Sequence, residues 1–146
     1  MDGFKKKTKN QSIFALIIFL SIFILIILLS VDFAVLNEIT QHPEYFYASE
    51  TVGLSMYPQL YTGDMIIIQT IDHPEFSILV GDIIVYQKEE HNVGHRVLQI
   101  NEDYYVTKGD NNIGYETVYP SQVLGRVYKI VDRYNPIGQF VFDKVI

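Results

Sequence analysis

The pattern of hydrophobic positions changes near residue 31, and the two sides of that point predict different structures. Residues 13–31, IFALIIFLSIFILIILLSV, carry no charge, and their only polar side chains are Ser21 and Ser30. A bilayer core of about 30 Å needs about 20 helical residues at about 1.5 Å each, so this run is long enough to span it. A globular helix is rarely apolar on every face over such a length. We therefore expect a transmembrane helix over residues 13–34.

A cleaved signal peptide is the competing interpretation of this run. Its apolar region would have about 7–15 residues and would end in small residues at a cleavage site. Here the run is longer and continues into VDFAVLNEI, where no A-x-A-like pair stands out. Four lysines lie just before it, within residues 5–9, and basic flanks stay on the cytoplasmic side of a membrane. The pattern favours an uncleaved signal anchor, with residues 1–12 as a cytoplasmic basic tail and residues 35–146 outside the cytoplasm.

After the apolar run the chain consists of short segments rich in β-branched and aromatic residues. They read YFYASETV, DMIIIQTI, DIIVYQ, VGHRVLQI, YYVTK, VLGRVYKIV and QFVFDKVI, with turn signals between them such as TGD at 62–64, EEHN at 89–92 and GDNNIG at 109–114. Short strands separated by Gly, Pro, Asn and Asp predict a mainly β domain. The runs MIII and DIIVY are typical of strands buried on both faces, or of strands facing a membrane or a substrate groove. The many Tyr and Phe are more typical of core than of cleft.

Charge and cysteine content narrow the classes of function. Residues 1–10 carry four Lys and one Asp, so the rest of the chain has a net charge of −9 within a total of −6. An acidic outer domain lacks the basic footprint of nucleic-acid binding, so we expect no nucleic-acid partner. The chain contains no cysteine, which removes thiol nucleophiles, disulfides and Cys-ligated zinc.

Ser55 is the candidate nucleophile, in the stretch GLSMYP at 53–58. A hydroxyl at such a bend can be exposed while the backbone N–H points into a pocket, which suits acyl transfer. Serine is a poor nucleophile unless a base lies within hydrogen-bond reach. Taken alone, Ser55 is better explained as an ordinary turn serine.

The chain has four histidines that could act as the base. His42 and His73 each precede a proline and are interpreted as loop residues, and His91 lies in the charged turn KEEHN. His95 instead begins the apolar segment HRVLQI, where its ring would be held, although a structural strand histidine is the alternative. His91 and His95 also form an H-x3-H pair, but the strand context argues against a metal site.

Asp110 is a candidate for orienting the base. It follows Gly109 in the turn TKGDNN at 107–112. An Asp-Asn-Asn turn is a good structural turn by itself. It also places a carboxylate where it could orient a histidine, the third role in a Ser-His-acid relay.

The order of these features resembles signal peptidase I, in the form found in archaea, the endoplasmic reticulum and some Gram-positive bacteria. That order is anchor, SMYP, GDMIII, GDIIVY, GHR, KGDNN and VLGRV, and it covers roughly residues 10 to 130. This form of the family has a histidine where the main bacterial enzymes carry a general-base lysine. The resemblance implies a mostly antiparallel β domain with a shallow apolar groove beside the membrane.

Four positions carry over from the family's motifs. Ser55 matches the nucleophile of the S-M-x-P box, and His95 matches the histidine of the H-R box and would be the general base. Asp110 matches the aspartate of the G-D-N-N box. The family usually has a further aspartate six residues later, and that position is Glu116 here. Both carboxylates are candidates for the relay acid, and residue identity favours Asp110.

One departure lies beside the nucleophile. The family commonly reads S-G-S-M, whereas this chain has Gly53 and Leu54 before Ser55. Gly53 replaces a serine whose hydroxyl helps to hold the oxyanion in some members. Losing one oxyanion donor costs about 100- to 1000-fold in rate, so we expect a divergent member with lower activity or a special substrate.

The resemblance implies a membrane-anchored serine endopeptidase that removes signal peptides from exported preproteins through an acyl-enzyme. It would lie in the cell membrane, or in the endoplasmic-reticulum membrane of a eukaryote, and need no metal or organic cofactor. Its partners would be secretory preproteins, membrane lipid and the secretion channel. Two alternatives remain open: a membrane-anchored β domain that binds or scaffolds partners, and a peptidase dedicated to one substrate, such as a pilin or matrix protein.

Overall fold

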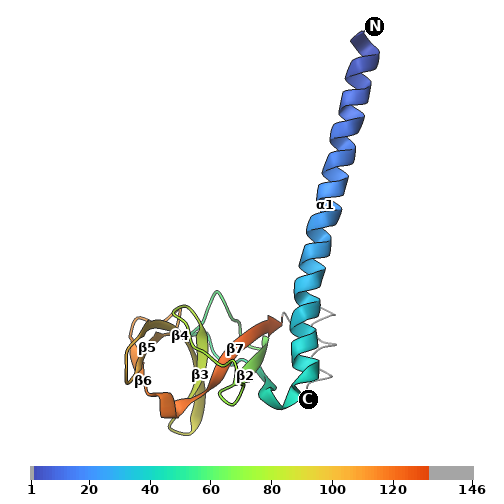
Figure 1. Cartoon of the computed structure of the whole chain (residues 1–146). Coiled ribbons are helices and arrows are strands. Elements are labelled where there is room, and N and C mark those ends of the chain that lie inside the picture. The colour runs from blue at the N-terminus through green and yellow to red at the C-terminus, as the bar shows by residue number, and fades with distance from the viewer. Residues whose placement is uncertain (1, 132–146) are drawn as a thin grey trace. The chain divides into compact units, whose positions relative to one another are not determined.

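The computed structural model describes residues 2–131, with side chains for residues 13–26 and 33–131. The strand expected at residues 139–146 lies outside the described residues. The chain divides into two compact units, with the boundary between Glu38 and Ile39. The first unit is helical and the second holds the β-sheet (Figure 1).

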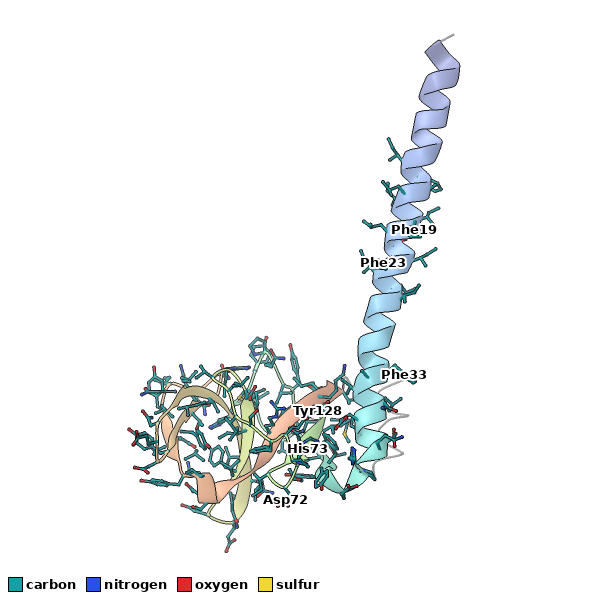
Figure 2. All side chains as sticks on the ribbon, in the orientation of Figure 1. Phe19, Phe23, Phe33, Asp72, His73 and Tyr128 are labelled. Atoms are coloured by element: carbon teal, nitrogen blue, oxygen red, sulfur yellow. The ribbon has the colours of Figure 1, made fainter. Side chains whose placement is uncertain are left out.

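The helix α1 runs from Asp2 to Gln41 and is longer than the expected span of residues 13–34. It ends before His42, because the residue that precedes a proline is disfavoured in helical conformation. Every side chain described between Ile13 and Ile26 is exposed, and Phe19 and Phe23 project from the ribbon (Figure 2). Among the described residues, no helix combines the length and the hydropathy needed to cross a membrane.

The second unit is mainly β, as expected, and its strands form one antiparallel sheet. The order across the sheet is β1-β2-β7-β3-β4-β5-β6, and every paired neighbour is antiparallel. The strands are β1 Phe46–Glu50, β2 Met65–Thr70, β3 Ile83–Lys88, β4 His91–Ile100, β5 Tyr105–Lys108, β6 Glu116–Val118 and β7 Val123–Val131. Two short 3-10 turns, Pro43–Tyr45 and Pro120–Gln122, precede β1 and β7.

Six of the seven strands correspond to segments that the sequence predicts, and β6 does not. A three-residue strand is too short to show alternation, so only its pairing with β5 reveals it. The turn expected at residues 89–92 is also shorter than predicted. Lys88 pairs with His91, which leaves Glu89 and Glu90 as a two-residue hairpin loop, with Glu89 at φ +54°.

The packing of β3 explains why its sequence is a continuous apolar run. Neighbouring side chains of a strand point to opposite faces, and each face of β3 packs into its own cluster. Ile83 and Val85 face one cluster, while Ile84 and Tyr86 face the other. The run is therefore buried on both faces, which is one of the alternatives predicted from its pattern. The first cluster also contains Met56, Leu60, Ile66 and Ile68, and the second contains Val97, Val118 and Val123.

Candidate active site

Ser55 lies in the loop between β1 and β2, and that loop is braced from within. Gly53 has φ +97°, a conformation that favours glycine. The Thr62 hydroxyl accepts from the Gly53 N–H at 3.0 Å and donates to the Gly53 carbonyl at 2.9 Å. Met56 is buried in the apolar cluster directly after the serine. Ser55 is thus half-buried, with hydrogen bonds at Gly53 holding the loop before it and the burial of Met56 holding the loop after it.

His95 lies on β4 and is 3% exposed. It pairs with Ile84 of β3, and opposed residues of an antiparallel pair share a face of the sheet, so its ring lies on the face that also carries Tyr86. The His95 Nδ1 is 3.1 Å from the Tyr86 hydroxyl oxygen. The same Nδ1 is 3.6 Å from Glu116 Oε2, which is too long for a direct hydrogen bond.

Sheet register brings Glu116 to this face from a distant part of the chain. Val97 of β4 pairs with Thr107 of β5, and Thr107 pairs with Glu116 of β6. The Glu116 carboxylate accepts a hydrogen bond from the Tyr86 hydroxyl through Oε2. Its Oε1 accepts from Lys88 Nζ at 2.8 Å. Of the two candidate acids, Glu116 is therefore the one whose carboxylate lies beside His95 Nδ1.

Asp110 has a different partner. Both of its oxygens accept hydrogen bonds from the Arg96 guanidinium, at 2.9 and 2.6 Å. Arg96 also donates to the Gly81 carbonyl at 2.7 Å. Asp110 therefore secures the turn that contains it to β4, and its charge acts on His95 only through space.

That turn, Gly109–Asn112, contacts both the serine loop and the histidine. The Asn111 N–H donates to the Ser55 carbonyl at 2.8 Å, and the Asn112 side-chain nitrogen is 3.5 Å from His95 Nε2. A Cβ added to Gly109 would lie 2.7 Å from the Ser55 carbonyl oxygen, so this close approach requires glycine. The structure thus brings Ser55 and the Nε2 edge of His95 to one turn, although within residues 2–131 no hydrogen bond joins the Ser55 hydroxyl to the imidazole.

Burial and charge set the protonation states of this group. Burial lowers the pKa of His95, and the Glu116 charge offsets part of that effect by raising it. Partial burial acts to raise the pKa of Glu116, but hydrogen bonds from Lys88 and Tyr86 outweigh it and lower the pKa overall. Burial, with the hydrogen bond to Glu116, raises the pKa of Tyr86. At neutral pH the group therefore contains a neutral imidazole, an ionised carboxylate and a protonated phenol.

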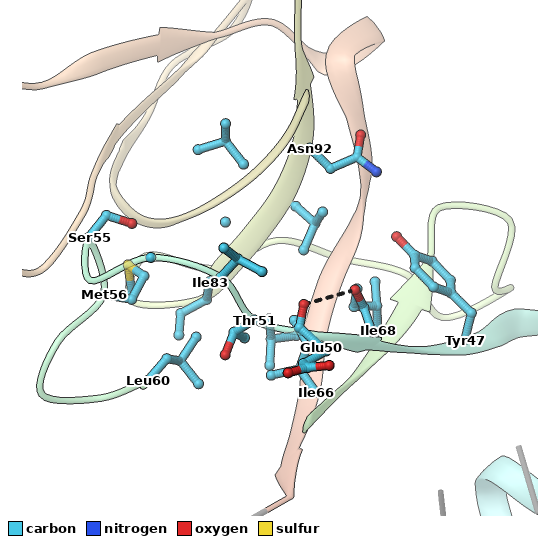
Figure 3. A pocket seen from close by; sticks show the side chains of 17 residues that line it. Tyr47, Glu50, Thr51, Ser55, Met56, Leu60, Ile66, Ile68, Ile83 and Asn92 are labelled. Carbon is cyan, nitrogen blue, oxygen red and sulfur yellow. Dashed lines mark hydrogen bonds between the residues drawn. The ribbon is translucent and has the colours of Figure 1, made fainter. Parts of the chain in front are cut away.

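A cleft of about 240 Å³ opens beside Ser55. Ser55 lies near one end of it and Tyr47 near the other (Figure 3). Its walls come from β1, an edge strand of the described sheet, and from residues 92–94 at the start of β4. The floor is the first apolar cluster: Met56, Leu60, Ile66, Ile68, Ile83 and Val85.

The other histidines lie in different surroundings. His73 is a buried loop residue whose ring contacts the rings of Tyr45 and Phe46. His42 and His91 are exposed. Among the side chains that the structure describes, no group of three or more His, Cys, Asp or Glu is placed to hold a metal ion.

In comparisons with known proteins, the chain matches no family model and no curated sequence. Its function must therefore be inferred from its residues and their geometry. The geometry adds two residues that sequence reasoning missed, Tyr86 and Lys88. Their spacing along β3 shows that they share a face, but their common partner, Glu116, is visible only in the sheet register.

Proposed function

We propose that this chain is a membrane-anchored serine endopeptidase of the signal peptidase I type, which removes signal peptides from exported preproteins. The observation that carries the proposal is the polarity of the His95 ring. Its Nδ1 edge faces Tyr86 and Glu116, while its Nε2 edge faces the turn that holds the Ser55 carbonyl. A general base in a Ser-His-acid relay needs this division between its two nitrogens.

In this mechanism the Ser55 hydroxyl attacks the scissile carbonyl and His95 Nε2 takes its proton. His95 then gives the proton to the departing amine, and a water activated by His95 hydrolyses the acyl-enzyme. Hydrogen bonds between nucleophile and base are often long without substrate and tighten in the complex. The separation of Ser55 from His95 before substrate binds is compatible with this scheme.

The position of the cleft beside Ser55 and an edge strand favours a peptide as the substrate. An extended preprotein segment can pair its main chain with β1, an edge strand of the described sheet, as peptides do when they add a strand to a sheet. The apolar floor then accepts substrate side chains next to the scissile bond, and the volume of about 240 Å³ favours small ones.

The backbone at Gly53 bears on the oxyanion hole. The family's serine at this position is absent, and φ +97° accounts for glycine. The Ser55 N–H donates to no protein acceptor in the described residues, which leaves it available as an oxyanion donor. With this one donor we expect cleavage about 100- to 1000-fold slower than with two.

The anchor is part of the same proposal. Residues 13–34 would span the membrane with residues 1–12 in the cytoplasm and the sheet on the other side. Confining enzyme and preprotein to one membrane raises their effective concentration, as a linker would. Preproteins, lipid and the secretion channel are the proposed partners, and the proposed chemistry needs no cofactor.

The test is cleavage of a secretory preprotein by the full chain in detergent, with the new N-terminus mapped by sequencing. We expect Ser55→Ala and His95→Ala each to abolish cleavage. Ser121→Ala, an exposed serine of the turn before β7, and His91→Ala, an exposed histidine of the same strand as His95, are the matched controls and should retain it. Absence of cleavage by the unmodified chain on every preprotein and on dedicated substrates such as pilins would favour the scaffolding alternative.

A further inference from the structure

We propose that Tyr86 is a positioning residue that couples His95 to Glu116 and fixes which imidazole nitrogen carries the proton. The inference rests on the proposed function for its catalytic consequence, because it assigns the His95 nitrogen that accepts the serine proton. The hydrogen-bond arrangement itself can be tested without any activity.

The distance between His95 and Glu116 requires a third group if the two are to be linked by hydrogen bonds. His95 Nδ1 and Glu116 Oε2 are 3.6 Å apart, beyond hydrogen-bond range. The Tyr86 hydroxyl contacts both of them, at 3.1 Å from His95 and within hydrogen-bond distance of Glu116. In this arrangement the glutamate reaches the imidazole through the phenol.

The direction of the hydrogen bonds follows from a count of protons. A phenol has one proton to donate, and an ionised carboxylate can only accept. The Tyr86 proton therefore goes to Glu116, and the Tyr86 oxygen can only accept from His95. His95 must then carry its proton on Nδ1, which leaves Nε2 as a bare lone pair facing the Asn112 side chain, in the turn that also contacts the Ser55 carbonyl.

The surroundings hold this arrangement in place. Tyr86 is 2% exposed and packs in the second apolar cluster, which limits movement of its ring. Lys88, two residues further along β3, donates to Glu116 Oε1 and so presents Oε2 to the phenol. The raised pKa of Tyr86 keeps the phenol protonated, and the lowered pKa of Glu116 keeps the carboxylate ionised.

Removing the Tyr86 hydroxyl should allow the proton of the His95 imidazole to move from Nδ1 to Nε2. In Tyr86→Phe the His95 Nδ1–H loses its acceptor, and imidazole then favours its intrinsically preferred form, with the proton on Nε2. In that form Nε2 cannot accept the serine proton. We expect kcat/KM to fall about 10- to 100-fold, mainly through kcat, because the cleft is untouched.

The decisive readout is the tautomer of His95 in the full chain in detergent micelles. Histidine ring nitrogens labelled with ¹⁵N report which nitrogen is protonated, and His95→Ala identifies the His95 signals. We expect the proton on Nδ1 in the unmodified chain and a shift toward Nε2 in Tyr86→Phe. Tyr105→Phe, which removes a hydroxyl from a residue packed against the same cluster, should leave the signals unchanged.

Glu116→Ala provides a second variant should Tyr86→Phe fail to fold. Without the carboxylate the Tyr86 proton is free to point at His95 Nδ1, so the imidazole proton should again move to Nε2. An Nε2–H tautomer in the unmodified chain, or an unchanged tautomer in the folded variants, would overturn the proposal. If the chain cleaves no substrate but the tautomer responds as stated, the positioning of His95 by Tyr86 is supported and the proposed function fails. If cleavage occurs and Tyr86→Phe leaves kcat/KM unchanged, the function stands and the catalytic role of Tyr86 is lost.

Discussion

Burial and neighbouring charges act in opposite directions on the pKa of the His95 imidazole. Burial lowers the pKa, the Glu116 charge raises it, and the Lys88 charge lowers it again. The outcome is an imidazole that is neutral near pH 7 although a carboxylate lies close by. Such a base can accept a serine proton without first losing one of its own.

The pH profile tests which carboxylate supports His95. Because only neutral His95 acts as a base, kcat/KM should rise with pH through its pKa, which lies below the ordinary value of about 6.5. Two carboxylate charges raise the pKa of His95, and that of Glu116 has the larger effect. Glu116→Gln removes it, so the rise of kcat/KM with pH should move to lower pH. Asp110→Asn should move it in the same direction by less.

We also expect Glu116→Gln to lower the plateau of kcat/KM about 10- to 100-fold, since the imidazolium formed during the reaction loses its counter-charge. The measurement is kcat/KM from pH 4.5 to 8.5 for both variants. A larger displacement in Asp110→Asn would assign the relay carboxylate to Asp110 instead.

At the scale of elements, the turn between β5 and β6 organises the site. It is tied to β4 by the Arg96–Asp110 ion pair, to the serine loop by Asn111, and to the histidine by Asn112. The contact with the serine loop connects segments that are more than fifty residues apart in the chain, whereas the two contacts with β4 span 14 and 17 residues. The position of Ser55 relative to His95 therefore depends on how closely this turn approaches the loop.

Gly109→Ala tests that dependence. The added methyl would meet the Ser55 carbonyl at 2.7 Å, and overpacking of this kind costs about 1–3 kcal/mol. We expect a lower thermal midpoint and a fall in kcat/KM, measured on the full chain. In the same turn region, Gly114→Ala has open space around its Cβ and should change neither quantity. Equal effects at both positions would show that the close approach is unimportant.

At the scale of the molecule, the apolar stretch of α1 and the sheet have separate tasks in the proposal. Twelve large apolar side chains between Ile13 and Ile26 are exposed to at least 44%. A segment of this kind has no protein partner among the described residues that would cover it. In the proposal a bilayer supplies that cover, and the sheet unit carries the catalytic residues.

Membrane extraction tests the anchor. We expect the unmodified chain to remain with membranes after alkaline carbonate washing. The double variant Leu20→Arg and Ile24→Arg should be released, because each charge near the centre of a span costs about 2.5–3.5 kcal/mol. Ile113→Arg, which places the same charge on a side chain that is 96% exposed in the sheet unit, should stay bound. Retention of the double variant would contradict a spanning anchor.

Local pattern predicted much of the second unit. Six of the seven strands and the loop that carries Ser55 follow from residues close together in sequence. The apolar run of β3 left two alternatives open, and the packing of both faces decided between them. The strand β6 and the short Glu89–Glu90 hairpin did not, since both depend on pairing rather than on composition. The signal peptidase resemblance named both candidate acids and favoured Asp110 by residue identity, whereas in the structure the Glu116 carboxylate lies beside His95 and Asp110 pairs with Arg96.

The amino-acid sequence by itself determined the long apolar run, the β character of the rest and the order of Ser55, His95 and the two carboxylates. Tertiary structure alone decided that Glu116 approaches His95, that Asp110 pairs with Arg96, and that the Tyr86 hydroxyl contacts both His95 and Glu116. The physical reason is the range of each interaction. Side-chain alternation along a strand is local, whereas the neighbours of a side chain across several strands depend on a register that the whole sheet sets.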